Sequence, residues 1–182
     1  MDENYWKDAY QDTWDEASKR EKRLMAYIEK SVGVKCSESG LGTGTTVYIS
    51  GTAEKNGYQK GDADFQVEGT NVYVEVTGPL VKTVRASDPL WFRPDKLDNA
   101  IKNRDHDVFL AHHCMSADLW RVIHIDQKFK QRFRAYEFKV VTPIIKGRQE
   151  RYVEIEATDR CIKSLNFLIE YLREIMRSQT IG

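Results

Sequence analysis

The chain has 182 residues, of which 41% are hydrophobic and 31% charged, and its 28 acidic residues balance its 28 basic residues. This length and composition suit one domain with a single buried core, and no apolar run is long enough to span a membrane. The net charge is zero, so the overall charge gives no sign of nucleic-acid binding. The three widely spaced cysteines argue against a disulfide framework and predict a cytoplasmic (intracellular) location.

The N-terminal segment carries apolar residues at steps of three and four from Trp6 to Val32. This spacing predicts one long amphipathic helix, or two in succession, that ends near residues 31–33. Glu29 flanks the apolar stripe and Glu21 lies more centrally in it, so each carboxylate is a candidate to point along the edge of the core. We expect residues 1–14 to form a helical extension of the core.

Small residues fill positions 36–44 and predict a flexible connection, whereas the β-branched residues of 45–50 predict a strand. The connection holds three glycines that resemble a phosphate-binding loop. Such a loop needs a Lys-Ser or Lys-Thr pair that opens a helix after a strand. Because these glycines precede a strand, we reject that interpretation.

Residues 63–67 and 71–77 alternate apolar and polar side chains and are separated by residues typical of turns. They predict two short strands, each with one buried face. Asp64 lies on the first strand and Glu75 on the second, so the two carboxylates can project toward the same region. Two carboxylates held together repel each other unless a cation lies between them, and hard oxygen ligands suit Mg²⁺.

The next helix is predicted to begin at Pro94, after an irregular stretch that follows Gly78 and Pro79. Lys96 borders the apolar face of this helix, which is formed by Leu97, Ala100 and Ile101. Residues 107–113 and 117–126 then predict two further strands.

The first of these strands ends in His112, His113 and Cys114, which raises the alternative of a zinc site. Neighbouring strand residues point to opposite faces, so His112 and Cys114 can share a metal that His113 does not readily reach. Hydrogen-bonded side chains on a buried strand are the preferred interpretation.

The C-terminal part is the most basic, since residues 118–151 hold nine bases and four acids. Residues 127–134 are expected to be helical or irregular, 136–145 and 149–157 to form a hairpin, and Asp159 to cap a final helix. The densest basic cluster alternates with phenylalanines and consists of Lys128, Lys130, Arg132 and Arg134. It can attract a polyanion or simply form a solvated surface.

This order of elements predicts an α/β (α+β) protein with a mixed central sheet flanked by helices. With Asp64 on one strand and Glu75-Val76-Thr77 on the next, it resembles the PD-(D/E)XK nuclease superfamily, which includes restriction endonucleases and Holliday junction resolvases. The resemblance spans residues 15–126 and implies a restriction endonuclease-like αβββαβ core. Residues 127–182 would add the hairpin and helix to a single domain over residues 1–182.

The resemblance implies a metal-dependent nuclease. Asp64 and Glu75 would bind one or two Mg²⁺ or Mn²⁺ ions, with the Val76 carbonyl and Glu29 as further ligands. Thr77 stands where the family usually has lysine, and it could hold a water. We expect Lys96 to take over the function of that lysine, with Lys82 and Lys102 as alternatives.

DNA is the expected substrate, cut internally, and a homodimer would suit cleavage of both strands. Arg93 and the basic cluster would hold the nucleic-acid backbone. A second hypothesis is a catalytically inactive nucleic-acid-binding or assembly module, which Thr77 and the neutral charge favour. The retained acidic positions argue against it, because carboxylates near phosphate weaken binding.

Overall fold

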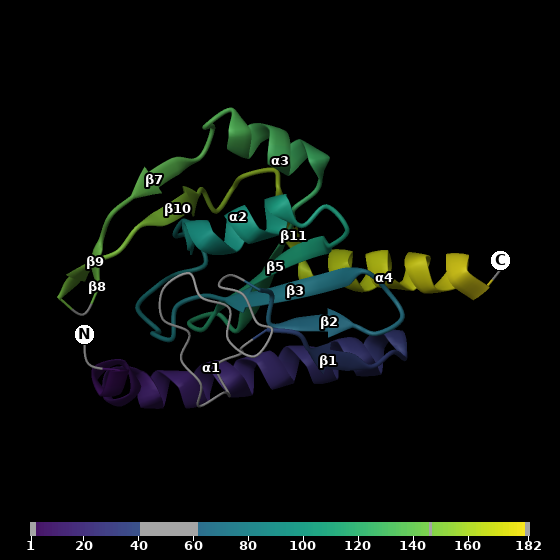
Figure 1. The fold of residues 1–182 in the computed structure, drawn as a ribbon, viewed down its shortest axis with the longest axis horizontal. Helices are drawn as coiled ribbons and strands as arrows, with labels where there is room; N and C mark the ends of the chain where they lie inside the picture. The colour runs from purple at the N-terminus through teal and green to yellow at the C-terminus, as the bar shows by residue number, and fades with distance from the viewer. Residues whose placement is uncertain (1–2, 41–61, 146, 181–182) are drawn as a thin grey trace.

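The computed structural model describes residues 3–40, 62–145 and 147–180, in a mixed α+β fold whose described part contains four helices. The predicted strand over 45–50 lies outside these residues. Figure 1 shows the main sheet between α1 and α4 on one side and α2 on the other. The predicted fold class, with a mixed central sheet flanked by helices, is confirmed.

Helix α1 (Glu3–Val32) is continuous and ends where Gly33 adopts a φ of +80°. Glycine reaches this conformation without a steric penalty, so it suits a helix end. From the middle of α1 onward, Ala17, Leu24 and Ile28 are buried. Leu24 and Ile28 pack with α4 (Leu165–Thr180) on one face of the sheet, which confirms the predicted apolar stripe over the second half of the helix.

The main sheet has the order β1-β2-β3-β5-β6-β11. Among its described strand pairs, only β3–β5 is parallel, and α2 lies in the connection between those two strands. A parallel pair requires such a crossover, whereas antiparallel neighbours do not. The six strands are β1 (Cys36–Glu38), β2 (Phe65–Val67), β3 (Val72–Thr77), β5 (Asp107–Cys114), β6 (Leu119–His124) and β11 (Ile162–Ser164).

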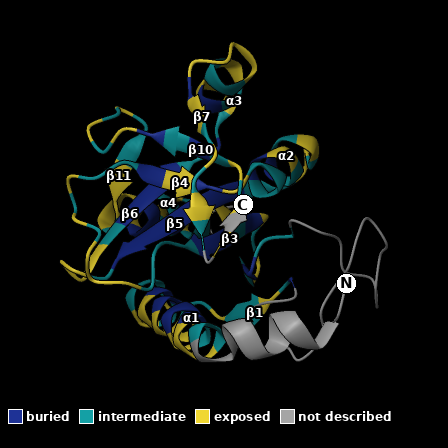
Figure 2. Ribbon diagram, turned by 90° about the vertical axis from the view of Figure 1, so that its left-hand side faces the viewer, coloured by how far each residue is buried: buried dark blue, intermediate teal, exposed yellow. Residues whose placement is uncertain are grey.

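A second apolar cluster covers the other face of the sheet and includes Leu97 and Ala100 of α2 (Pro94–Lys102). Phe129 joins it from α3 (Gln127–Arg134), whose first turn is capped by Asp126. A small antiparallel sheet completes this layer (Figure 2), with β4 (Leu90–Phe92), β10 (Tyr152–Ile155) and β7 (Lys139–Val141). The predicted C-terminal hairpin is confirmed by β7–β10 and its tip, β8 (Ile144–Ile145) and β9 (Arg148–Gln149).

Three local predictions were wrong. Residues 36–38 form β1 and pair with β2 instead of serving only as a flexible connection. Residues 90–92, expected to be irregular, form β4 because β10 supplies a partner from far along the chain. Asp159 does not cap α4, because 162–164 first pair with β6 as β11 and the helix begins only at Leu165.

None of the described helices is long and apolar enough to cross a membrane. The three cysteines, Cys36, Cys114 and Cys161, are free thiols.

Candidate functional site

Asp64 and Glu75 lie on neighbouring strands of the main sheet. Asp64 directly precedes β2, where its N–H donates to the Val74 carbonyl at 3.1 Å and so extends the β2–β3 pairing. Because side chains alternate between faces, Glu75 shares a face of β3 with Tyr73 and Thr77, on the side covered by α2. Asp64 and Glu75 are only 8% and 7% exposed, so both carboxylates are largely withdrawn from water.

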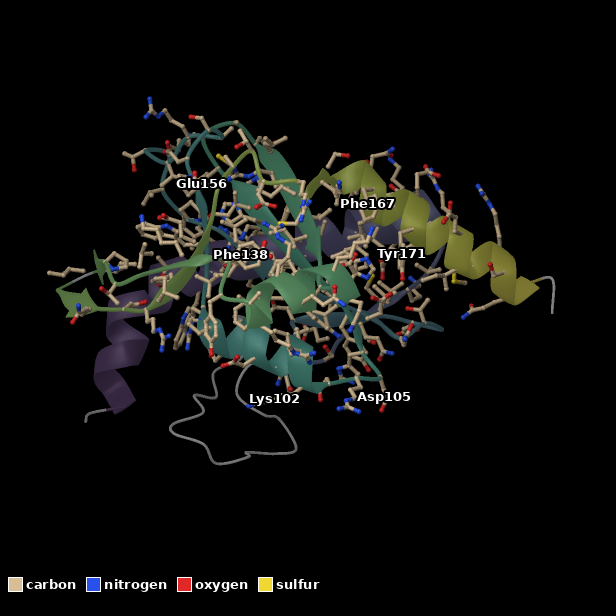
Figure 3. All side chains as sticks on the ribbon, turned by 90° about the horizontal axis from the view of Figure 1, so that it is seen from above. Lys102, Asp105, Phe138, Glu156, Phe167 and Tyr171 are labelled. Carbon is tan, nitrogen blue, oxygen red and sulfur yellow. The ribbon has the colours of Figure 1, made fainter. Side chains whose placement is uncertain are left out.

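Lys96 reaches this pair of carboxylates from α2. Its Nζ donates to Glu75 Oε2 at 2.9 Å and to the Asp62 carbonyl at 3.0 Å. The Val76 N–H donates to Asp64 Oδ2 at 2.6 Å, which fixes the second carboxylate against β3. The placement expected of Lys96 is therefore observed, whereas Lys82 and Lys102 are exposed, the latter at the end of α2 (Figure 3).

Burial disfavours the charged forms of both carboxylates, and the charge of Asp64 adds to this effect at Glu75. Burial, followed by the charge of Asp64, raises the pKa of Glu75 to about 8 despite its ion pair with Lys96. Burial also raises the pKa of Asp64. For Lys96 burial alone would lower the pKa, but Glu75 and Asp64 outweigh it and the pKa is raised. The lysine thus stays protonated while two acids compete for its single charge.

Helix α1 contributes Glu21, and not the Glu29 named as a metal ligand from the sequence. Glu21 is 8% exposed, and its charge contributes to the raised pKa of Glu75. Glu29 Oε1 instead accepts a hydrogen bond from the Cys36 N–H at 2.9 Å, at the start of β1. Eight residues of helix separate the two glutamates by about 12 Å, so one site does not accommodate both. The more central place of Glu21 in the apolar stripe was the signal that favoured it.

Arg20 is a site residue that the sequence analysis missed. Its Nη1 donates to the Gly78 carbonyl at 2.8 Å, and its Nε has no hydrogen-bond acceptor within the described part of the chain. Burial lowers the pKa of Arg20, and the charges of Glu21, Asp64 and Glu75 oppose that shift. A buried guanidinium therefore lies beside the acids at the end of β3.

No family model matches the sequence, and no curated protein matches it. Among solved structures, the chain is similar to D212, a nuclease from a fusselovirus, with a TM-score of 0.41 and 18% sequence identity. The matched region covers 66% of this chain and 66% of that nuclease. Similarity at this level does not assign a function, so the assignment depends on the site residues themselves.

Thr77 and Val76 extend the site along β3. Thr77 is half-buried and lies two residues beyond Glu75 on the same face of the strand. Val76 is buried on the opposite face, and its N–H is bonded to Asp64. Their roles, as a hydroxyl that holds a water and a carbonyl that binds a metal, stay predictions.

Arg132 is engaged elsewhere in the fold. Its guanidinium binds both oxygens of Asp159 at 2.7 and 2.8 Å, contacts Glu137 at 2.7 Å and lies 4.7 Å from the centre of the Phe138 ring. It therefore fastens α3 to the C-terminal segment and is not free to hold a phosphate in this structure. The sequence could not distinguish it from its basic neighbours.

The other basic candidates stay more accessible. Lys128 and Arg134 are exposed on α3 and Lys130 is half-buried. Arg93, at the start of α2, is exposed and paired with Asp95 at 3.1 Å. In Figures 1 and 2, α3 lies farther from β3 than α2 does. The α3 cluster is therefore separate from the carboxylates.

The zinc alternative is contradicted by the contacts of its residues. His112 lies 3.3 Å from an Arg121 nitrogen and His113 2.8 Å from Asp118, while the Cys114 thiol contacts Ser116. Among the residues that the structure describes, no three His, Cys, Asp or Glu side chains are grouped to hold a metal ion. A cation beside Asp64 and Glu75 would thus take other ligands from carbonyls and water, as Mg²⁺ commonly does.

Proposed function

We propose that the protein is a metal-dependent nuclease that hydrolyses phosphodiester bonds, with DNA as its substrate and internal cleavage as its mode of attack. The observation that carries this proposal is the buried cluster in which Lys96 Nζ lies 2.9 Å from Glu75 beside Asp64. Two acids can bind a divalent metal ion and a nearby lysine can stabilise developing negative charge, and both contributions assist phosphodiester hydrolysis.

The donor set fits a divalent cation. No hydrogen bond from the described residues reaches Asp64 Oδ1 or Glu75 Oε1, so each carboxylate has an oxygen available to a ligand. Asp64 and Glu75 would hold Mg²⁺ or Mn²⁺, with the Val76 carbonyl and water as the further ligands in place of Glu29. A bound divalent ion lowers the pKa of its water and neutralises charge on the phosphate.

Lys96 would act as a protonated donor and not as the base. Its raised pKa keeps the ammonium charged, and its bond to the Asp62 carbonyl holds it in place. From there it would donate to a phosphoryl oxygen or orient the attacking water, while the Thr77 hydroxyl would hold that water. Preorganised donors of this kind stabilise charge that develops in the transition state.

The nucleic-acid backbone would be held by exposed basic residues outside the carboxylate cluster, namely Arg93, Lys128, Lys130 and Arg134. Phosphate contacts of this type add affinity without reading sequence. We expect the protein to act in the cytoplasm. A homodimer would provide one site for each strand of a duplex.

A second candidate is a catalytically inactive nucleic-acid-binding or assembly module. The observation that favours it is the Lys96–Glu75 ion pair itself, which neutralises one of the two acids without any cation. Such a module would bind nucleic acid in a salt-dependent manner without turnover.

The test is cleavage of plasmid, linear duplex, branched DNA and RNA by the full chain, with Mg²⁺, Mn²⁺ or EDTA. Activity that requires the metal and is lost in both Asp64→Asn and Glu75→Gln would support the nuclease. Asp98→Asn is the matched control, because Asp98 is an exposed acid on the same helix as Lys96. Wild-type activity in both site variants would overturn the proposal, and binding without cleavage in the unmodified chain would favour the inactive module.

A further inference from the structure

A cavity of about 280 Å³ opens beside the carboxylate cluster. This volume is just below the ~300 Å³ at which small-molecule pockets usually begin, so it suits one planar group and not a larger ligand. The residues that matter for its chemistry come from β1, β2, β3 and the segments before β2 and β5: Ser37, Glu38, Asp62, Gln66, Tyr73 and His106.

The cavity lies on the same sheet face as the proposed metal site. Gln66 follows Asp64 by two residues and Tyr73 precedes Glu75 by two, so the two sites are about 7 Å apart along the strands. Asp62 joins them, because its carbonyl accepts from Lys96 and its Oδ1 accepts from the Asn99 amide at 3.3 Å. A phosphate at the carboxylates and a group in the cavity therefore fit within one nucleotide or two adjacent ones.

An aromatic stack forms one wall of the cavity. The rings of Tyr73 and His106 lie 3.9 Å apart at an interplanar angle of 17°. Both residues line the cavity and both are half-buried. Flat aromatic surfaces of this kind bind unpaired bases by stacking, largely independently of sequence.

The charge of the cavity excludes a phosphate. Glu38 and Asp62 supply two carboxylates to its lining, and these would repel an anion at short range. Carboxylates do accept hydrogen bonds from exocyclic amino groups, such as that of cytosine. Thymine and uracil lack this amino group and would bind less tightly to these carboxylates.

We propose that this cavity binds an unpaired nucleobase with an exocyclic amino group, next to the phosphate to be cut. The inference depends on the proposed function, since it places the base relative to the carboxylate site. A base in a duplex is stacked on both faces and paired along its edge, so it must leave the helix to enter such a pocket. The enzyme would accordingly prefer single-stranded or distorted DNA over intact duplex.

The test measures binding of fluorescent oligo(dC), oligo(dT) and a dC·dG duplex to the full chain, with Ca²⁺ in place of Mg²⁺ so that binding is read separately from cleavage. His106→Ala should weaken binding of oligo(dC) by about 5- to 150-fold, which corresponds to about 1–3 kcal/mol for the stacking of one base. Duplex binding should change by less than about twofold. His106→Phe keeps a flat ring and should retain affinity, whereas Glu38→Gln should reduce the preference for oligo(dC) over oligo(dT).

Tyr136→Ala is the matched control, because Tyr136 is an aromatic residue that is 92% exposed and lies outside the cavity. If His106→Ala behaves like Tyr136→Ala while metal-dependent cleavage persists, the base pocket is overturned and the proposed function stands. Equal binding of oligo(dC) and oligo(dT) would also overturn the pocket. If no strand binds and none is cut, the proposed function fails, and the pocket fails with it.

Discussion

Lys96 Nζ lies 2.9 Å from Glu75 Oε2, although the lysine belongs to a helix and the acid to a strand that precedes it in the chain. The two side chains are 23% and 9% exposed, so water screens their attraction little. This contact supplies the positive charge that Thr77 does not. It also makes the lysine the first residue to test.

Lys96→Met should reduce cleavage by about 10²–10³-fold, the usual effect of removing one preorganised donor to transition-state charge. Circular dichroism and thermal melting should show a folded protein. Lys102→Met, an exposed lysine on the same helix, should keep the parental rate. An undiminished rate in Lys96→Met would remove Lys96 from the mechanism.

Stability without metal should fall as the pH rises from about 4.5 to about 8, the interval between the ordinary pKa of a glutamate and the raised pKa of Glu75. In this interval the folded protein holds a proton that the unfolded chain has lost, so each rise in pH favours unfolding. Melting curves across this interval, with EDTA present, measure the slope.

The slope should flatten in Glu75→Gln, which does not titrate. Saturating Mg²⁺ should raise the melting temperature most at the alkaline end, because the metal binds the deprotonated carboxylates. A slope that is unchanged in Glu75→Gln would place the titrating group elsewhere.

Arg132→Ala should destabilise the protein by about 1.5–3 kcal/mol, since it removes hydrogen bonds to a carboxylate that is itself 16% exposed. Lys128→Ala should instead leave stability unchanged and weaken DNA binding. The slope of log K against log salt concentration should fall by about 1, as expected for the loss of one phosphate contact. Urea denaturation and binding at several salt concentrations separate the two effects. If Arg132→Ala weakened DNA binding and left stability unchanged, Arg132 would belong to the DNA-binding surface.

Gly78→Ala should destabilise the fold by about 1–3 kcal/mol. Gly78 has a φ of +122°, and a Cβ atom there would lie 2.3 Å from the His113 carbonyl oxygen. Because Arg20 is anchored on the Gly78 carbonyl, the variant should also lower the rate of cleavage. Gly147→Ala is the matched control, since a Cβ at that left-handed glycine meets nothing within 4 Å. Equal stability of the two variants would contradict the steric argument.

Strand alternation was sufficient to pair Asp64 with Glu75, because a period of two fixes which side chains share a face. The helix predicted to begin at Pro94 likewise indicated Lys96, because this lysine borders the apolar face that packs on the sheet. The sequence favoured Glu21 over Glu29 only through its more central place in the apolar stripe, because the position of each carboxylate depends on where α1 crosses the sheet. The pairing of β4 and the contacts of Arg132 were beyond the sequence, because their partners Ile155 and Asp159 are remote in the chain.

The parallel pairing of β3 with β5 has a consequence for the newly made protein. The β2–β3 hairpin, which carries both acids, leaves the ribosome before α2, which carries their lysine. A parallel pair forms only after its crossover is complete. Non-local pairings of this kind form slowly. The proposed site would therefore stay incomplete in a nascent chain until β5 has been synthesised and α2 has packed against the sheet.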